Sequence, residues 1–369
     1  MSQATLDAIF GAYQQIQSQG PFGIKTSKLV IQESNLTRQA IASELGAAAG
    51  SNGLPSASAI ALTENVTAGC NIALWGINWQ SGDRILVSDC EHPGVIASIK
   101  EICRRFQVSI DFFPLLATLN GGNPVEVITT HLQPQTRLVV LSHVLWNTGQ
   151  VLPLAEITTA IHGYSQANDR VYILVDAAQS VGLLSLNLDE LGVDFYAFTG
   201  HKWWCGPEGV GGLYIRPDII EDLNPTFIGW RGLDYGQSEL PLINDARRYE
   251  VATSAYPLYV GLRASIELHQ QWGSSINRAT KIISLATYLW ESLRQVPGIK
   301  CLNQTVPQSG LVSFQVKPAN HGKLVQLLED QHLYLRTIVD PDCIRACTHY
   351  FTTTAEIDRL IQCLSKLIK

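Results

Sequence analysis

Charge is scarce in this chain, and its small excess is negative. Only 16% of the 369 residues are charged, and the net charge is −6. Nucleic-acid binding and anchoring to an anionic membrane both require clustered basic residues, so this composition argues against both kinds of partner. No apolar run approaches the roughly 18 residues that a membrane-spanning helix requires. We therefore expect no nucleic-acid and no membrane partner.

Motifs for metals, disulfides and export are lacking as well. The eight cysteines are scattered and form no Cys-x-x-Cys pair, so we expect no metal site. Free thiols are typical of a reducing compartment. Residues 1–17 have apolar residues at helical spacing and no basic start of the kind found in secretory signals, so they predict an amphipathic helix. These features together predict a cytoplasmic protein.

Hydrophobic residues are plentiful, at 46%, and they occur in short runs that alternate with helical patterns. Strand-like runs occupy Ala59–Leu62, Arg84–Ser88, Leu138–Leu141, Val171–Val175, Phe195–Phe198 and Gly212–Ile215. Helical patterns lie between them, at Ala68–Asn78, Pro93–Phe106, Pro124–His131, Pro153–Gln166 and Asn187–Leu191. Such alternation predicts an α/β fold, with a mostly parallel central sheet covered by helices on both faces.

A second, smaller domain is expected after the pattern changes near Pro257. Helices are predicted over Tyr259–Trp272, Ile276–Val296, Gly322–Asp330 and Ala355–Leu367, and strands over Leu311–Val316, Leu333–Thr337 and Ile344–Thr348. A chain of this length has two domains as its natural expectation. We predict a large domain over residues 15–274 and a small α+β domain over residues 275–369, with a helix over residues 1–14 packed on the small domain.

One lysine stands at the exit of a strand-like run rich in aromatic residues. Phe195–Phe198 is followed by Thr199-Gly-His201-Lys202 and then by a glycine-rich stretch. In a parallel sheet, ligands bind beyond the carboxyl ends of the strands. A lysine there pairs with an anion, faces solvent or reacts, and its amine can form a Schiff base with a carbonyl compound. Lys202 is therefore a candidate catalytic residue.

A carboxylate ends another strand, within the segment Asp176-Ala-Ala178-Gln179. A buried aspartate is costly unless it faces a cation or hydrogen-bond donors. A helix cap or structural ion pair would explain Asp176 as well as an ion pair with a protonated pyridine nitrogen would. In the second case Ala178 leaves space for a flat ring, and Gln179 can donate a hydrogen bond to a phenolic oxygen.

Three further strand ends carry polar residues. Asn65 and Thr67 stand at a strand-to-helix junction, where backbone N–H groups and a hydroxyl would suit a phosphate, although both are also ordinary N-cap residues. His92 precedes Pro93 after the next strand and would cover the face of an aromatic ring, or else lie at the surface. Asn147 follows the run Leu138–Leu141 and offers an amide at the same edge.

Taken together, these segments resemble the class V aminotransferase family, in its cysteine-desulfurase-like branch. The resemblance rests on Asp176-x-x-Gln179, Thr199-x-His201-Lys202 and Gly209-x-Gly211, and it extends over about residues 35–355. It implies the fold type I architecture of enzymes that use pyridoxal 5'-phosphate, with Lys202 holding the cofactor as a Schiff base. It further implies an ion pair from Asp176 to the ring nitrogen and a contact from Gln179 to the ring oxygen.

The resemblance also assigns the other candidate residues. His92 would stack on the ring and Ala178 would lie beside it, Asn147 would contact the ring oxygen or the substrate carboxylate, and the phosphate would be bound by Val66, Thr67, Thr199 and His201. Arg248-Tyr-Glu-Val-Ala-Thr253 resembles a segment whose threonine reaches the phosphate of a neighbouring subunit. A homodimer with Thr253 contributed across the interface is therefore implied. Arg345 resembles the arginine that clamps the carboxylate of an amino-acid substrate.

A departure from the desulfurase pattern indicates the reaction. Desulfurases carry a nucleophilic cysteine a dozen or more residues before that arginine, whereas residues 310–342 contain none. The resemblance then implies a carbon–sulfur lyase that releases sulfur from cystine or cysteine by β-elimination, with pyruvate and ammonia as the other products. A persulfide leaves more readily than a thiolate, which favours cystine. An iron–sulfur apoprotein is the expected sulfur acceptor.

Three alternatives stay open. A desulfurase with a displaced nucleophile, such as Cys343, would yield alanine and an enzyme-bound persulfide. An epimerase would leave the sulfur in place, and a catalytically silent scaffold would bind pyridoxal phosphate or nothing. Members of the family usually begin with a strand that approaches the substrate site, whereas this sequence begins with the helix expected at residues 1–17. If the chain is a trimmed form, part of the substrate pocket is missing.

Overall fold

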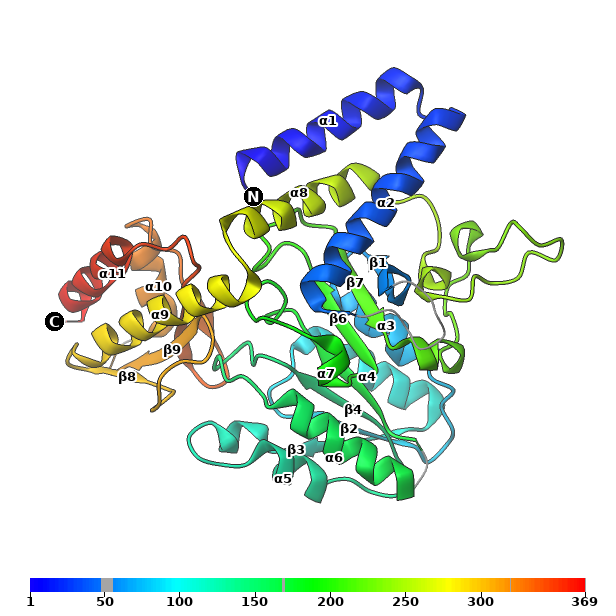
Figure 1. Cartoon of the computed structure of the whole chain (residues 1–369). Coiled ribbons are helices and arrows are strands. Elements are labelled where there is room, and N and C mark those ends of the chain that lie inside the picture. Colours follow the sequence, from blue (N-terminus) through cyan, green and yellow to red (C-terminus); the bar gives the residue numbers. More distant parts are fainter. Residues whose placement is uncertain (48–55, 168–169, 319, 369) are drawn as a thin grey trace.

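The computed structural model describes residues 1–47, 56–167, 170–318 and 320–368, and in these it contains two β-sheets (Figure 1). The larger sheet has seven strands in the order β1-β7-β6-β5-β4-β2-β3. Its strands are β1 Ile60–Thr63, β2 Arg84–Ser88, β3 Ser109–Phe113, β4 Thr136–Ser142, β5 Tyr172–Asp176, β6 Phe195–Thr199 and β7 Gly211–Ile215. Only β7 runs antiparallel to its neighbours, so the predicted mostly parallel sheet is confirmed.

Helices cover both faces of this sheet. The helices around it are α2 Ile24–Leu45, α3 Val66–Gly76, α4 Pro93–Phe106, α5 Pro124–Thr130, α6 Leu154–Ala167, α7 Leu188–Leu191 and α8 Tyr256–Trp272. One hydrophobic cluster joins the sheet to α2, α5, α6, α7 and α8, and another joins its opposite face to α3 and α4. Since both faces are covered, the central strands β5 and β6 are buried throughout and mostly apolar, and each ends in a polar residue, Asp176 and Thr199.

The smaller sheet is antiparallel, with the order β10-β11-β9-β8. Its strands are β8 Ile299–Cys301, β9 Leu311–Val316, β10 Arg336–Ile338 and β11 Cys343–Cys347. The helices α9 Ser275–Arg294, α10 His321–Glu329 and α11 Thr354–Leu367 pack on it around a separate hydrophobic cluster. These elements lie to one side of the large sheet in Figure 1. The boundary at residue 275 remains a prediction.

The N-terminal helix packs differently from the expectation. Helix α1, Gln3–Gln19, lies along α8 and touches α2, not the small sheet and its helices (Figure 1). The contact is close because α8 carries Gly261, where a Cβ atom would lie only 2.4 Å from Ile9. The expected packing of this helix on the small domain is therefore wrong, because Ile9, its buried apolar residue, faces the glycine of α8.

Short 3-10 helices complete the described chain at Ser56–Ala59, Leu115–Thr118, Pro217–Asp222, Trp230–Gly232 and Ala246–Tyr249. In the residues that the structure describes, every helix is too short or too polar to cross a lipid bilayer.

Candidate active site

The parallel strands bring the candidate residues to one edge of the large sheet. Strands β1, β2, β4, β5 and β6 all run in the same direction, so their carboxyl ends share that edge. Ser142 of β4 lies beside Asp176 of β5, which lies beside Ala197 of β6. Loops leaving these ends carry the segments with His92, Asn147 and Lys202, as the strand pattern predicts.

Lys202 lies in a half-buried position that several charges surround. Burial lowers the pKa of its amine, and the carboxylate of Asp176 opposes this shift. The guanidinium groups of Arg345 and Arg336 lower the pKa further. A lysine with a lowered pKa is neutral for a larger fraction of the time, and the neutral amine is the form that attacks carbonyl carbons and accepts protons.

Asp176 is 5% exposed and accepts a hydrogen bond from the backbone N–H of Ala178, at 2.9 Å. Burial raises the pKa of its carboxyl, while that hydrogen bond and the positive charges of Lys202 and His92 lower it. A buried carboxylate in this position gains from an additional cation nearby. A protonated ring nitrogen is a cation of the required kind, so Asp176 fits the role that the family resemblance implies.

His92 stands at the start of α4, where its Nδ1 accepts the backbone N–H of Gly94 at 3.2 Å. Its ring meets that of Trp146 edge to face, with 5.7 Å between the ring centres. Burial lowers the pKa of His92, and Lys202 and Asp176 act on it in opposite directions. A neutral, partly exposed imidazole over the strand ends is suited to stack on an aromatic ligand.

The expected phosphate site lies where α3 begins. Asn65 caps this helix by accepting the N–H of Ala68, at 3.0 Å. Gly211 joins it to the end of β6, since a Cβ atom there would lie 2.9 Å from the Cα of Asn65 and 2.4 Å from the carbonyl oxygen of Phe198. Any larger residue would separate the two elements, so glycine keeps them together.

The side chains around this helix start belong to the predicted phosphate ligands. Thr199 and His201 are hydrogen bonded to each other, with 2.8 Å between Oγ1 and Nδ1. Thr67 lies by the start of α4, because its Oγ1 would be 3.5 Å from a Cβ atom on Gly94. Val66 and Thr67 form the first turn of α3, where unpaired N–H groups and the helix dipole favour an anion. Their roles toward a phosphate remain predictions.

Two arginines of the small sheet face this site. Arg345 on β11 lies directly opposite Arg336 on β10 in the antiparallel register. Arg345 donates a hydrogen bond to the carbonyl oxygen of Trp146, while its buried Nε has no partner among the described residues. Like charges placed opposite each other destabilise a sheet. The pair therefore indicates that an anionic ligand compensates the two positive charges.

Asn147 contributes another unsatisfied group. It is 3% exposed and donates from Nδ2 to the carbonyl oxygen of Asp340, at 3.2 Å, while its Oδ1 has no partner among the described residues. Buried polar atoms are nearly always hydrogen bonded in folded proteins. An unpaired acceptor in Asn147 and an unpaired donor in Arg345 together indicate a polar ligand at this end of the sheet.

The sequence of the whole chain agrees with this geometry. A family model described as aminotransferase class V matches residues 2–360. A probable cysteine desulfurase of Chlamydia trachomatis is 31% identical over 283 residues, which cover 75% of this chain and 68% of the relative. The chain belongs to the class V aminotransferase family. Isopenicillin N epimerase of Streptomyces clavuligerus is 28% identical, over 84% of this class V chain and 80% of that enzyme.

Two solved structures of higher similarity concern the protein C-DES. One is a complex of the cystine C–S lyase C-DES with its reaction product cysteine persulfide, with 47% identity, a TM-score of 0.92 and coverage of 99% of this chain and 94% of that one. The other is a lysine-to-alanine variant of C-DES with glycine covalently linked to its pyridoxal phosphate cofactor. It is 46% identical, with a TM-score of 0.93 and coverage of 99% and 93%.

The residues of this class V chain fit pyridoxal phosphate. The fit rests on a partly buried lysine beside a buried aspartate, on the small Ala178 next to that aspartate, and on a capped helix start at the same edge. No cluster of three or more histidine, cysteine, aspartate or glutamate side chains suited to a metal occurs in the described part of the chain.

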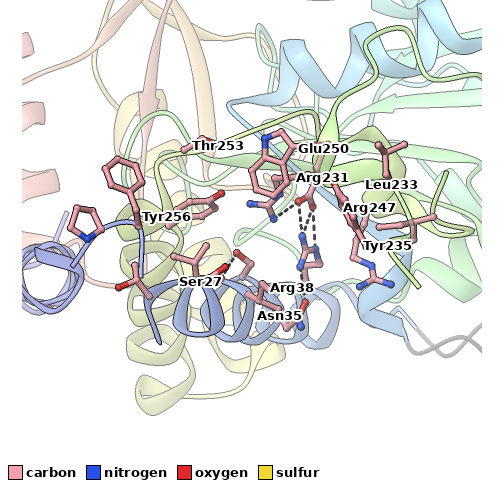
Figure 2. Close-up of a pocket in the computed structure, with 18 of the residues that line it drawn as sticks. Ser27, Asn35, Arg38, Arg231, Leu233, Tyr235, Arg247, Glu250, Thr253 and Tyr256 are labelled. Atoms are coloured by element: carbon pink, nitrogen blue, oxygen red, sulfur yellow. Dashed lines mark hydrogen bonds and ion pairs between the residues drawn. The ribbon is translucent and has the colours of Figure 1, made fainter. Parts of the chain in front are cut away.

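Thr253 borders two cavities. It lines a cavity of about 490 Å³ together with Arg38, Arg231 and Tyr256, and none of the other candidate residues lines that cavity (Figure 2). Glu250 also lines this cavity; it is 5% exposed and forms ion pairs with Arg38 and Arg231. Thr253 also lines a second cavity, of about 360 Å³, together with Thr63, Glu64 and Ala68 beside the start of α3. Its role toward the phosphate of a neighbouring subunit remains a prediction.

The cysteines differ sharply in accessibility. Cys343 is fully buried, and burial raises the pKa of its thiol to about 11, so it is a poor nucleophile. Cys347 on the same strand is exposed and lies beside Arg345. Surrounding protein atoms raise the pKa of its thiol, whereas Arg345 and Lys202 lower it. If a displaced nucleophile exists, Cys347 is better placed for it than Cys343.

Sequence reasoning missed Arg336. Arg336 lowers the pKa of both Lys202 and His92, so it belongs to the site. The predicted strand Leu333–Thr337 contains it, but only the strand register places it opposite Arg345. Trp203 and Trp204, which follow Lys202 directly in the sequence, are buried, at 6% and 1% exposure, and pack into the protein core.

Proposed function

We propose that this protein is a pyridoxal-phosphate-dependent carbon–sulfur lyase that splits cystine by β-elimination. The observation that carries this proposal is the combination of Lys202 beside Asp176 with 47% identity, over nearly the whole chain, to the cystine C–S lyase C-DES. The absence of cysteine from residues 310–342 supports elimination over desulfuration. The overall change consumes cystine and water and releases cysteine persulfide, pyruvate and ammonia.

The surroundings of Lys202 and Asp176 indicate the role of each side chain in the reaction. Bound pyridoxal phosphate withdraws electrons from the substrate Cα and so makes its proton acidic. Lys202, whose amine has a lowered pKa, holds the cofactor and then accepts the Cα proton. Asp176 would pair with the ring nitrogen of the cofactor and so favour its protonated form. Lys202 can return the proton to the departing sulfur, so that no proton is lost in the step.

Cystine is the favoured substrate because it carries two carboxylates. Arg345 and Arg336 face each other across two strands, and each can bind a carboxylate through paired N–H donors. Cysteine offers only one carboxylate and leaves one guanidinium without an anion. The persulfide released from cystine is also a better leaving group than a thiolate, so the binding and the chemistry favour the same substrate.

Product analysis tests the proposal. The protein loaded with pyridoxal phosphate is incubated with cystine, and pyruvate, ammonia, persulfide and alanine are measured. Pyruvate and persulfide in equal amounts are expected, and Lys202→Ala should abolish both. Alanine in place of pyruvate would contradict elimination, and intact cystine with inverted stereochemistry would indicate an epimerase.

A cysteine desulfurase is the second candidate, favoured by the 31% identical relative and by Cys347. Its mechanism would require a thiol that attacks the sulfur of a cysteine substrate and retains it as a persulfide. Cys347→Ala would then abolish turnover, whereas the lyase proposal expects turnover to persist. Cys343→Ala serves as the buried control and should leave both products unchanged.

We further propose a homodimer in which Thr253 reaches the phosphate site of the partner subunit. The lining of the cavity of about 490 Å³ beside Thr253 includes exposed apolar side chains, among them Phe22, Ile31, Trp230 and Tyr235. Exposed apolar side chains that gather around one cavity are typical of an interface. Sedimentation should show twice the mass of 40.5 kDa, and Thr253→Val should weaken cofactor binding without changing the mass.

The setting in the cell follows from the same proposal. We place the protein in the cytoplasm, where reduced cysteines are the rule. An iron–sulfur apoprotein is the proposed recipient of the persulfide sulfur. Transfer of labelled sulfur from cystine to such an apoprotein, dependent on Lys202, would test this assignment, and transfer at the same rate with Lys202→Ala would contradict it.

A further inference from the structure

Gln179 has a defined orientation that the reaction scheme leaves unexplained. This residue follows β5 by three positions and is 8% exposed. Its Oε1 accepts the indole N–H of Trp203, at 2.9 Å. An indole nitrogen can only donate, so the oxygen end of the carboxamide must face Trp203. The NH₂ end is consequently directed away from Trp203 and is left free to donate elsewhere.

Trp203 is itself held by the small sheet and its connections. Its ring stacks on that of His349, with 5.6 Å between centres and an interplanar angle of 23°. It also lies against Gly310, where a Cβ atom would be only 2.6 Å from the indole ring. Gly310 precedes β9 and His349 follows β11, so the indole ring packs against two segments that flank strands of the small sheet.

The hydrogen bonds of His349 fix its protonation state and strengthen its contact with Trp203. Nδ1 accepts the backbone N–H of Tyr350, at 3.0 Å, so it carries no proton. Nε2 therefore carries the proton and donates to the carbonyl oxygen of Trp203, at 2.9 Å. Burial lowers the pKa of His349 to about 4, which keeps this arrangement at neutral pH. Both the ring and the backbone of Trp203 are thus immobilised.

We propose that Trp203 is a positioning residue that orients the carboxamide of Gln179, so that its NH₂ group donates to the phenolic oxygen of bound pyridoxal phosphate. This inference rests on the proposed function for the presence of the cofactor. Trp203 is adjacent to Lys202 in the chain, so a single indole connects the cofactor-binding lysine, the group that contacts the ring oxygen and the small sheet that carries Arg345.

Trp203→Phe tests the inference, because it retains an aromatic ring and removes the N–H donor. The carboxamide of Gln179 can then turn, and its donation to the ring oxygen is partly lost. A donor stabilises negative charge on that oxygen and favours the deprotonated form of the bound cofactor. We expect the pH midpoint of the cofactor's visible absorption change to rise by about half a unit or more, and kcat for cystine to fall about tenfold.

Trp204→Phe is the matched control. Trp204 is the next residue, is also buried and donates its indole N–H to Glu44, at 3.4 Å, whereas the indole that donates to Gln179 is that of Trp203. We expect its absorption midpoint to equal that of the unmodified chain. Thermal unfolding of both variants, followed by circular dichroism, verifies that each is folded before its spectrum is interpreted.

A double-variant cycle separates positioning from a general structural effect. In a chain that carries Gln179→Ala, the added Trp203→Phe should produce no further shift of the midpoint. An equal shift in Trp204→Phe, a further shift in the Gln179→Ala background or no shift in Trp203→Phe would overturn the inference, as would failure of the unmodified chain to bind pyridoxal phosphate. Absence of pyruvate with a normal shift would instead overturn only the proposed reaction.

Discussion

Replacing Arg345 with alanine should reduce catalysis strongly while lowering the stability of the ligand-free protein only moderately. The change removes a guanidinium that faces Arg336 across two strands, and relief of that like-charge contact stabilises the fold by ~0.2–1 kcal/mol. It also removes the hydrogen bond from the charged guanidinium to the carbonyl oxygen of Trp146, which costs ~1.5–3 kcal/mol. The two contributions partly cancel, so the free energy of unfolding should fall by about 1–2 kcal/mol.

The effect on the reaction should be much larger. A charge-assisted hydrogen bond to a carboxylate contributes about 1.5–3 kcal/mol, which corresponds to a loss of roughly 10- to 100-fold in kcat/KM for Arg345→Ala. Arg345→Lys keeps the charge but loses the paired donors, and should recover only part of this loss. Steady-state pyruvate release and urea denaturation of the same preparations measure the two quantities.

Arg336→Ala extends the test to substrate choice. If Arg336 binds the second carboxylate of cystine, its removal should raise KM for cystine about tenfold and leave KM for cysteine unchanged. Arg294→Ala is a control for the loss of an exposed positive charge, since Arg294 stacks on Trp290 in the last turn of α9. Equal effects on cystine and cysteine, or unaltered kinetics of Arg345→Ala, would refute this reasoning.

Three further outcomes follow from buried groups. Burial raises the pKa of Glu91 from its ordinary value near 4.5 to about 7. The free energy of unfolding should therefore fall by about 3 kcal/mol as the pH rises from 5 to 8. Urea titrations at the two pH values should show a smaller difference for Glu91→Gln. Arg38→Met should lower the free energy of unfolding by about 3 kcal/mol, because it leaves the carboxylate of Glu250 with fewer partners. Adding Glu250→Gln should recover part of that loss, and an unchanged urea midpoint for Arg38→Met alone would contradict the account. Cys343→Ala should leave turnover unchanged, since this thiol is fully buried and its pKa is raised to about 11; a loss of pyruvate release in a folded variant would show otherwise.

The central sheet and its edge could be predicted because the sequence pattern and the fold agree there. Strands such as β2 and helices such as α4 begin and end at the predicted residues, since apolar runs, Pro93 and polar strand exits mark their limits. The segments after each strand carry the candidate side chains, and parallel strands bring their ends together. Lys202, Asp176 and His92 therefore lie near one another, as expected from their places in the sequence.

Other elements had weak signals for physical reasons. Helix α2 was not predicted, because much of its buried face is polar: Ser34, Thr37 and Arg38 are all buried, and hydrogen bonds replace the usual apolar stripe. Strand β3 lies at the edge of the sheet and carries Asp111, which is paired with an arginine of β2. An apolar periodicity cannot reveal elements whose partners are polar.

Contacts between distant segments were also beyond reach of the pattern. The role of Arg336 depends on a strand register that no local sequence signal specifies. The hydrogen bond between Trp203 and Gln179 depends on how the segments of the small sheet pack against the indole ring. A tryptophan after a lysine is usually a packing residue, and the sequence pattern does not show what it packs against. Only the three-dimensional structure shows that Trp203 is buried in the core and donates a hydrogen bond to Gln179 of the site.

The most direct test of the account is to locate the covalent attachment of the cofactor. The full chain is incubated with pyridoxal phosphate, treated with borohydride, digested and mapped by mass spectrometry. We expect a single reduced pyridoxyl adduct on Lys202, with Lys202→Ala yielding none. A protein without any adduct, or one modified equally on its exposed lysines, would contradict the assignment of Lys202 on which the proposed reaction depends.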